Sequence, residues 1–138
     1  MEYAQSEYPW TAATATLEVR GDTLEPDVVS TRLGLTPHGK KAPGPDPRGY
    51  DGDSAGLWML DASPWPGKSL AEQLEELSEV VEAHADALRE LQDSGCEVRV
   101  VAFGFVGGVA HLEISAECVR RLGAQGISLH LDPSSNSR

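Results

Sequence analysis

The sequence predicts an α+β fold, a two-layer sandwich in which helices cover one face of a mixed sheet of about five strands. Two observations lead to this fold class. Strand and helix periodicities alternate along the chain, and a glycine pair at Gly107 and Gly108 between two β-rich runs interrupts that alternation. With 138 residues, 40% of them hydrophobic, we expect one domain (1–138), with an ordered core over 12–132 and a disordered tail over 133–138.

The first half of the chain shows two strands separated by a helix and a long loop. Residues 13–19 alternate between apolar and polar, which is typical of a half-buried strand. Pro26 begins a short helix, and Gly34 ends it. Nine glycines and prolines among residues 37–56 predict a loop without helix or strand. Residues 57–60 then form a short buried strand.

A long helical pattern occupies residues 69–94. Ser69 and Glu72 form a capping box at its start, and leucines and valines at steps of three and four give it one apolar stripe. The pattern leaves open whether the helix is continuous or broken near 82–84.

The last third of the chain predicts a hairpin, a helix and a final strand. The glycine pair joins residues 96–106 to residues 109–114, Ser115 caps a short helix, and residues 127–131 alternate as a strand. The register across the glycine pair places the larger apolar side chains on one face. The predicted core consists of Leu17, Val19, Leu74, Leu77, Val81, Leu88, Val101, Phe103, Leu112, Ile114, Leu129 and Leu131.

An internal echo offers a more specific topology. A strand at 17–19 precedes a helix that ends Arg-Leu-Gly at 32–34, and a strand at 112–114 precedes a helix that ends Arg-Leu-Gly at 121–123. Two such units around a pseudo-twofold axis would give a ferredoxin-like arrangement with an added strand and helix. Chance explains so short an echo nearly as well, so both topologies stay open.

The charge balance limits the partners. The 22 acidic residues exceed the 11 basic ones, and a net charge of −11 argues against nucleic acid and anionic membranes. No apolar run is long enough for a membrane span and the first residues do not resemble a signal peptide, so we expect a cytoplasmic protein. Cys96 and Cys118 are expected to be reduced, buried hydrophobes, and four scattered histidines without ligand spacing predict neither a metal site nor a cofactor.

The order of these signals resembles a known family. Residues 21–29 show the pattern G-D-x-L-x-P-D-x-V, residues 32–37 show R-L-G-L-x-P, and W-x-L follows at 58–60. With the stretch at 111–132, this order is similar to the bacterial domain-of-unknown-function family 4279, over roughly residues 12–132. The resemblance implies a small bacterial protein, and it transfers no functional residue because the family has no established catalytic set.

One helix carries most of the excess negative charge. Residues 69–94 contain eight carboxylates and one arginine, so seven of the eleven net charges lie there. We therefore favour a non-enzymatic protein-binding module that presents this helix to a basic partner, as an immunity protein or inhibitor does. A solubilising helix face is the plainer explanation. The candidate partner-binding residues are Glu72, Glu75, Glu76, Glu79, Glu82 and Asp86.

The alternative function is a small anionic-ligand-binding domain or a weakly marked enzyme. The 37–56 loop is locally rich in basic residues and could close as a lid near the following strand. The candidate ligand-binding residues are His38, Lys40, Lys41, Arg48, Tyr50 and Trp58. No catalytic residues are predicted, because the sequence has no nucleophile elbow or phosphate-binding loop. The position of a pocket would discriminate between the two functions.

Overall fold

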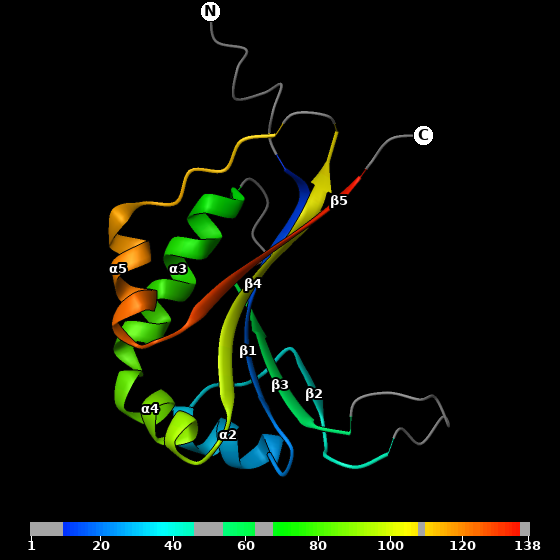
Figure 1. The fold of residues 1–138 in the computed structure, drawn as a ribbon, viewed down its shortest axis with the longest axis vertical. Helices are drawn as coiled ribbons and strands as arrows, with labels where there is room; N and C mark the ends of the chain where they lie inside the picture. Colours follow the sequence, from blue (N-terminus) through cyan, green and yellow to red (C-terminus); the bar gives the residue numbers. More distant parts are fainter. Residues whose placement is uncertain (1–9, 46–53, 63–67, 108–109, 136–138) are drawn as a thin grey trace, which may run out of the picture.

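In the described part of the chain the sheet has five strands, and β1 lies at its centre (Figure 1). The computed structural model describes residues 10–45, 54–62, 68–107 and 110–135. The strand order is β2-β3-β1-β4-β5, and all neighbouring strands are antiparallel except β4 and β5. The strands are β1 (Thr11–Gly21), β2 (Gly39–Lys41), β3 (Gly56–Asp61), β4 (Glu97–Val106) and β5 (Ser128–Ser135). The predicted mixed sheet in an α+β fold is confirmed.

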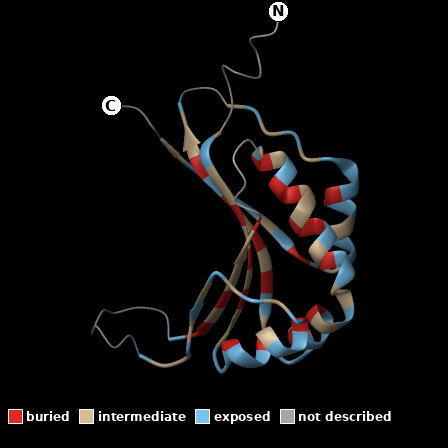
Figure 2. Cartoon of the chain, turned by 180° about the vertical axis from the view of Figure 1, so that it is seen from behind, coloured by how far each residue is buried: buried red, intermediate tan, exposed pale blue. Residues whose placement is uncertain are grey.

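The four helices of the described residues pack on one face of this sheet, as Figures 1 and 2 show from opposite sides. They are α2 (Pro26–Leu33), α3 (Leu70–Ala83), α4 (Ala85–Asp93) and α5 (Ala116–Ala124). The predicted capping box at Ser69 is present, and Gly34 ends α2 in the left-handed conformation with φ 68°. The long helical pattern is divided at His84, the residue between α3 and α4.

The core lies between the helices and the covered face of the sheet. Leu17 of β1 is paired with Val100 of β4, and both side chains are buried. Six residues of the predicted core are confirmed as buried, namely Leu17, Val19, Leu74, Leu77, Val81 and Leu88. Leu112, Ile114 and Leu129 are only partly buried, although they pack against the core.

The predicted hairpin across the glycine pair is wrong. Residues 110–114 have no regular structure, and β4 pairs with β1 and β5 instead. The predicted face of β4 is also wrong by one position. Val98, Val100 and Ala102 face the core, Val101 is half-buried on the opposite face, and Phe103 is 40% exposed there. Leu131 of β5 is also exposed, at 49%.

The loop and the tail contain more structure than the sequence indicated. β2 lies inside the 37–56 segment and pairs with β3, where Lys40 is opposite Trp58, and β3 itself begins at Gly56. β5 extends into the predicted disordered tail as far as Ser135, because pairing with β4 continues to Val106. The ferredoxin-like alternative required a strand at 112–114 and does not form.

Candidate functional site

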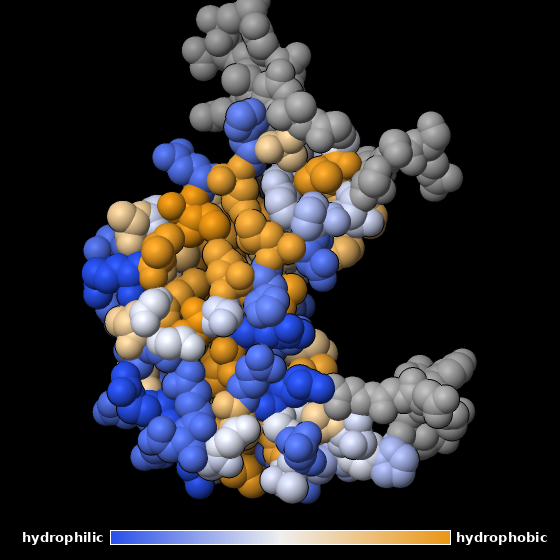
Figure 3. Space-filling view, viewed as in Figure 1, coloured by the Kyte–Doolittle hydropathy of each residue, from blue (hydrophilic) through white to orange (hydrophobic). Residues whose placement is uncertain are grey.

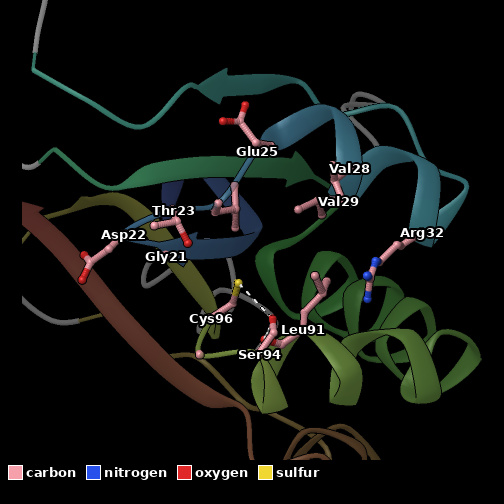
Figure 4. A pocket seen from close by; sticks show the side chains of 12 residues that line it. Gly21, Asp22, Thr23, Glu25, Val28, Val29, Arg32, Leu91, Ser94 and Cys96 are labelled. Atoms are coloured by element: carbon pink, nitrogen blue, oxygen red, sulfur yellow. Dashed lines mark hydrogen bonds between the residues drawn. The ribbon is translucent and has the colours of Figure 1, made fainter.

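A pocket of about 440 Å³ opens between the β1–α2 turn, α2 and the end of α4 (Figure 4). Among the described residues twelve line it, from two segments far apart in the sequence, 21–32 and 91–96. They are Gly21, Asp22, Thr23, Leu24, Glu25, Val28, Val29, Arg32, Leu91, Ser94, Gly95 and Cys96. Its volume is within the range of small-molecule sites and of pockets that accept a single anchoring side chain.

The turn that forms one wall is fixed by close packing. The backbone N–H of Leu24 donates to the carbonyl oxygen of Gly21 at 3.2 Å, and Pro26 begins α2 directly afterwards. The Leu24 carbonyl lies against Gly56 of β3, where a Cβ atom would be only 2.1 Å from the Leu24 oxygen. Glycine at position 56 therefore allows the turn to rest on the sheet.

The lining is apolar in the middle and polar around the rim. Val29 and Leu91 are buried beneath the opening, and Val28 remains 49% exposed beside them. Cys96 and Ser94 lie on the α4 side, with the Cys96 Sγ 3.9 Å from the Ser94 Oγ (Figure 4). The pocket can therefore receive an apolar group and offer it hydrogen-bonding neighbours.

Three charged side chains belong to the lining. Asp22 and Glu25 are exposed near the turn, and Arg32 extends from α2 on the opposite side (Figure 4). The Arg32 guanidinium lies 3.6 Å from the Glu90 carboxylate of α4, and both side chains are about half exposed. This ion pair joins the helices on either side of the pocket, and the rim keeps a net negative charge.

The predicted ligand-binding residues of the 37–56 segment that the structure describes each interact with a different part of the fold. Lys40 forms an ion pair with Asp27 at 3.1 Å, and the Lys41 ammonium donates to the carbonyl oxygen of Ala55 at 2.8 Å. His38 accepts a hydrogen bond from the backbone N–H of Asp61 at 3.1 Å. None of these residues lines the pocket.

The other three candidates of that group are either buried in the core or outside the residues that the structure describes. Trp58 is fully buried, and its indole N–H donates to the Ser30 hydroxyl oxygen at 3.0 Å, which gives it a structural role. Arg48 and Tyr50 lie outside the residues that the structure describes.

The acidic residues of α3 mostly interact within the chain. Glu75 forms an ion pair with Arg121 at 3.1 Å and accepts a hydrogen bond from the Ser115 hydroxyl. Glu82 contacts both arginines of α5, Arg120 at 3.2 Å and Arg121 at 3.5 Å. The negative charge predicted from the sequence on this helix thus serves in part to hold α5 against it.

Of the remaining acidic candidates, two have a hydrogen-bond or ion-pair partner in the described residues and two have none. Glu76 forms an ion pair with Lys68 at 2.7 Å, and Glu72 closes the capping box. The backbone N–H of Ser69 donates to Glu72 and lowers the pKa of that carboxyl below its usual range. Within the described part of the chain, Glu79 and Asp86 make no hydrogen bond or ion pair.

The two arginines of α5 lie against the carboxylates of α3. Arg121 is only 16% exposed and lies against carboxylates on two helices. The Arg120 guanidinium hydrogen-bonds Glu117 and lowers the pKa of that carboxyl, while Glu117 and then Glu82 raise the pKa of Arg120. The positive charge of Arg120 offsets part of the negative charge of Glu82. The pair therefore reduces the acidic surface that α3 can offer to a partner.

The two cysteines have different environments. Cys118 of α5 is fully buried, and burial raises the pKa of its thiol. Cys96 is half-buried at the pocket rather than fully buried as expected. Among the described residues, no group of three or more histidine, cysteine or carboxylate side chains could hold a metal ion. No helix in the described ranges is long and apolar enough to cross a membrane.

Sequence reasoning missed this pocket because its residues also have ordinary folding roles. Gly21, Asp22 and Pro26 were interpreted as a turn and a helix start, which they are. The proximity of Arg32 to Cys96 has no local signal in the sequence, since it depends on how α4 returns to the sheet. The one available signal was the G-D-x-L-x-P pattern, which carried the family resemblance and forms the pocket wall.

Comparison with known proteins gives one match. The family model described as Domain of unknown function (DUF4279) matches residues 11–136, which includes every described strand and helix. No curated protein and no solved structure matches the chain.

Proposed function

This chain belongs to the DUF4279 family, and we propose that it is a non-enzymatic binding module for a basic protein partner, as an immunity protein or inhibitor would be. The observation that carries the proposal is the pocket between the β1–α2 turn and α4, with an apolar interior inside an acidic rim. A basic partner that inserts one apolar side chain would satisfy both features.

The apolar interior supplies the anchoring contact. Val28 exposes about half of its surface on α2, directly above the buried side chains of Val29 and Leu91. An apolar side chain from a partner would cover Val28 and displace water from this floor. Most of the binding energy of an interface comes from a few such buried anchors.

The rim supplies the charge preference. Asp22 and Glu25 are exposed on the turn and line the pocket, and the exposed Glu90 of α4 pairs with Arg32 of the lining. These three carboxylates outnumber the one guanidinium of the lining, Arg32, so the rim attracts a basic surface. Glu79 and Asp86, the unengaged members of the predicted acidic face, add to the negative field of the same helical layer.

The lining favours binding over catalysis. The Cys96 thiol and the Ser94 hydroxyl contact each other, and no histidine or carboxylate lies among their hydrogen-bond partners in the described residues. A nucleophile needs a base within hydrogen-bonding distance to become active at neutral pH. The pocket therefore has polar atoms for recognition without the pairing that covalent chemistry requires.

The test uses two matched exposed valines. Val28→Asp places a carboxylate in the pocket, and Val119→Asp makes the same change on α5, where Val119 is 56% exposed. Partners are captured from a lysate of the native cell at low and high salt and identified by mass spectrometry. We expect a basic protein that wild type and Val119→Asp retain, that Val28→Asp loses, and that high salt releases.

Purified partner then gives the decisive measurement. The dissociation constant should rise by about a hundredfold for Val28→Asp, because a charge would be buried against an apolar anchor. Equal binding by both aspartate variants would contradict the pocket as the interface. An acidic partner, or binding that does not respond to salt, would contradict the charge preference.

A small anionic ligand is the second candidate, and the presence of Arg32 in the pocket wall favours it. Such a ligand would compete with Glu90 for the guanidinium. Thermal shift measurements on the purified protein with a panel of carboxylates and phosphates would test it. Stabilisation that Arg32→Gln abolishes and Val119→Asp leaves unchanged would favour this function over a protein partner.

A further inference from the structure

The two edges of the sheet differ in how they are protected from pairing with another strand. β2 forms one edge, is three residues long and carries Lys40 and Lys41. Short length and lysines are the usual means by which an edge strand avoids intermolecular pairing. β5 forms the other edge over eight residues and has no lysine or arginine.

The outer side of β5 is open in the described structure. β4 is the only strand paired with it among the described residues, so the N–H and C=O groups directed away from β4 have no partner strand there. Such a row of backbone groups is a template for a further strand. β5 contains one proline, Pro133, near its end.

An apolar surface accompanies this open edge. Leu131 pairs with the buried Ala102, which places it on the helix-covered side of the sheet, yet it is 49% exposed. Leu129 is its neighbour on the same side. Figure 3 shows hydrophobic side chains gathered where β5 passes the segment that leads to α5. That segment contributes Leu112 and Ile114, which are partly buried.

We propose that β5 is a homodimer interface, in which it pairs antiparallel with β5 of a second copy across a twofold axis at Leu131. This pairing would join two five-stranded sheets into one continuous sheet of ten strands. A twofold interface requires a self-complementary patch, and an antiparallel strand pair is self-complementary about any of its residues. The side-chain charges of β5 select which residue lies on the axis.

With Leu131 on the axis, the polar face of the pair is complementary. His130 lies opposite Asp132 of the second copy, and Asp132 lies opposite His130 of the second copy, because these residues flank the axis. Both pair with outward-facing residues of β4, Val101 and Phe103, so they share the open face of the sheet. An imidazole N–H donates to a carboxylate in either protonation state of the histidine.

The neighbouring registers are less favourable. An axis at His130 would place the two imidazoles opposite each other, and an axis at Asp132 would oppose two carboxylates. A register shifted by one residue would direct the leucines of one copy toward the polar face of the other. The Leu131 axis alone combines paired opposite charges with a Leu131 to Leu131 contact.

Pro133 limits the length of the pairing without preventing it. With Leu131 on the axis, residues 129–133 of the two copies form a five-residue ladder. At each end of this ladder, Pro133 of one copy lies opposite Leu129 of the other. A missing N–H at the end of a ladder removes at most one hydrogen bond there. The same apolar face then has Leu129 and Pro133 on either side of the central leucine pair.

The first experiment compares two substitutions at side chains of equal exposure. Leu131→Lys places two like charges together on the axis, whereas Val28→Lys changes an equally exposed residue, also at 49%, on α2. Sedimentation equilibrium over a concentration series should give a dimer of twice the 14.8 kDa monomer mass for wild type and Val28→Lys. Leu131→Lys should raise the dimer dissociation constant by about tenfold or more.

The second experiment tests the register. In a Cys96→Ser background, Leu131→Cys should form a covalent dimer under mild oxidation, because residues on the axis have Cβ atoms about 4.5 to 5.5 Å apart. Leu129→Cys should not, because its own counterpart is four positions away along the opposing strand. Circular dichroism of each variant verifies that it is folded.

Three results would overturn the proposal. They are a wild-type monomer at every concentration, a dimer whose stability is the same in Leu131→Lys, and a dimer that Val28→Lys disrupts instead. Preferential cross-linking through Leu129→Cys would overturn the Leu131 axis. Since Val28→Lys alters the partner pocket and leaves β5 intact, failure of the dimer and failure of the proposed partner site are distinguishable.

Discussion

Gly56 lies where β3 passes closest to the β1–α2 turn, and its lack of a side chain determines the shape of the pocket wall. A Cβ atom there would overlap the Leu24 carbonyl oxygen. Gly56→Ala should therefore lower the free energy of unfolding by about 1 to 3 kcal/mol, because backbone must move. Gly123→Ala is the control, since nothing lies within 4 Å of that position in α5 and alanine favours a helix. Urea denaturation of both variants checks this, and equal stabilities would contradict it.

Gln73 is a buried side chain that hydrogen-bonds backbone groups of β1 where no neighbouring strand of the described residues does so. Its amide oxygen accepts from the backbone N–H of Ala15 at 2.9 Å, and its amide nitrogen donates to the carbonyl oxygen of Ala13 at 3.0 Å. These β1 groups lie beyond the end of β3, whose pairing with β1 begins at Thr16. The helix thus completes the hydrogen bonding of the central strand.

Gln73→Ala should lower the free energy of unfolding by about 2 to 4 kcal/mol, because the buried N–H of Ala15 and the part-buried carbonyl of Ala13 lose this partner. Gln92→Ala is the matched control, since Gln92 makes a single half-buried hydrogen bond to the Gln125 carbonyl. Its substitution should cost about 1 kcal/mol or less. Chemical denaturation of both variants makes the comparison, and a smaller effect at Gln73 than at Gln92 would refute the interpretation.

The two thiols should react very differently. Cys118 is fully buried, and burial raises the pKa of its thiol, so it has little reactive thiolate. Cys96 is half-buried beside the pocket. A chromogenic disulfide reagent should titrate one thiol in the native protein and both in denaturant. Mass spectrometry of the labelled peptide should place the native label on Cys96, and rapid native labelling of Cys118 would contradict this.

At the level of single elements, the first turn of α3 gives a pH prediction. The backbone N–H of Ser69, the N-cap residue, lowers the pKa of Glu72, so the folded state binds a proton less readily there than the unfolded state. The stability that results is present above the ordinary pKa of glutamate and is lost as pH falls through the lowered value. Glu72→Gln cannot titrate, so the advantage of wild type over this variant should shrink as the pH falls below about 4.3. Thermal unfolding across this pH range measures it, and a constant difference would disprove it.

The same scale shows why some elements were predictable and one was not. The caps of α2, α3 and α5 depend on local residues, and each formed as the sequence indicated. In β4, apolar residues occupy both alternating sets, so hydrophobicity could not choose the buried face. The polar residues Glu97 and Arg99 share a face with Phe103, and they were the better guide. The size of Phe103 favoured the wrong face.

The hairpin predicted from the glycine pair at 107 and 108 is wrong because the partners of β4 come from distant parts of the chain. A two-residue hairpin turn requires its flanking segments to pair with each other, and the neighbours of β4 were instead supplied by β1 and β5. The parallel partner β5 follows α5, as crossover connections require. Long-range pairing of this kind leaves no local sequence signal.

At the scale of the whole molecule, the sequence predicts how much negative charge the long helical segment carries, but not which side chains those carboxylates contact. Composition identified the acidic helix, but the two α5 arginines that Glu75 and Glu82 contact lie nearly 40 positions or more away in the sequence. The pocket was unpredictable for the same reason, because its walls come from the β1–α2 turn and the end of α4. The fold class required only local periodicity, whereas the site required knowledge of packing.

The central position of β1 has a consequence for how the chain is made. β1 leaves the ribosome before both of the strands that flank it, and Thr16 can meet Val101 only after all the residues between them have been synthesised. A topology with such a high contact order folds slowly and leaves a strand-forming segment unpaired during synthesis. Chaperone binding to the nascent chain would therefore be strongest before β4 emerges.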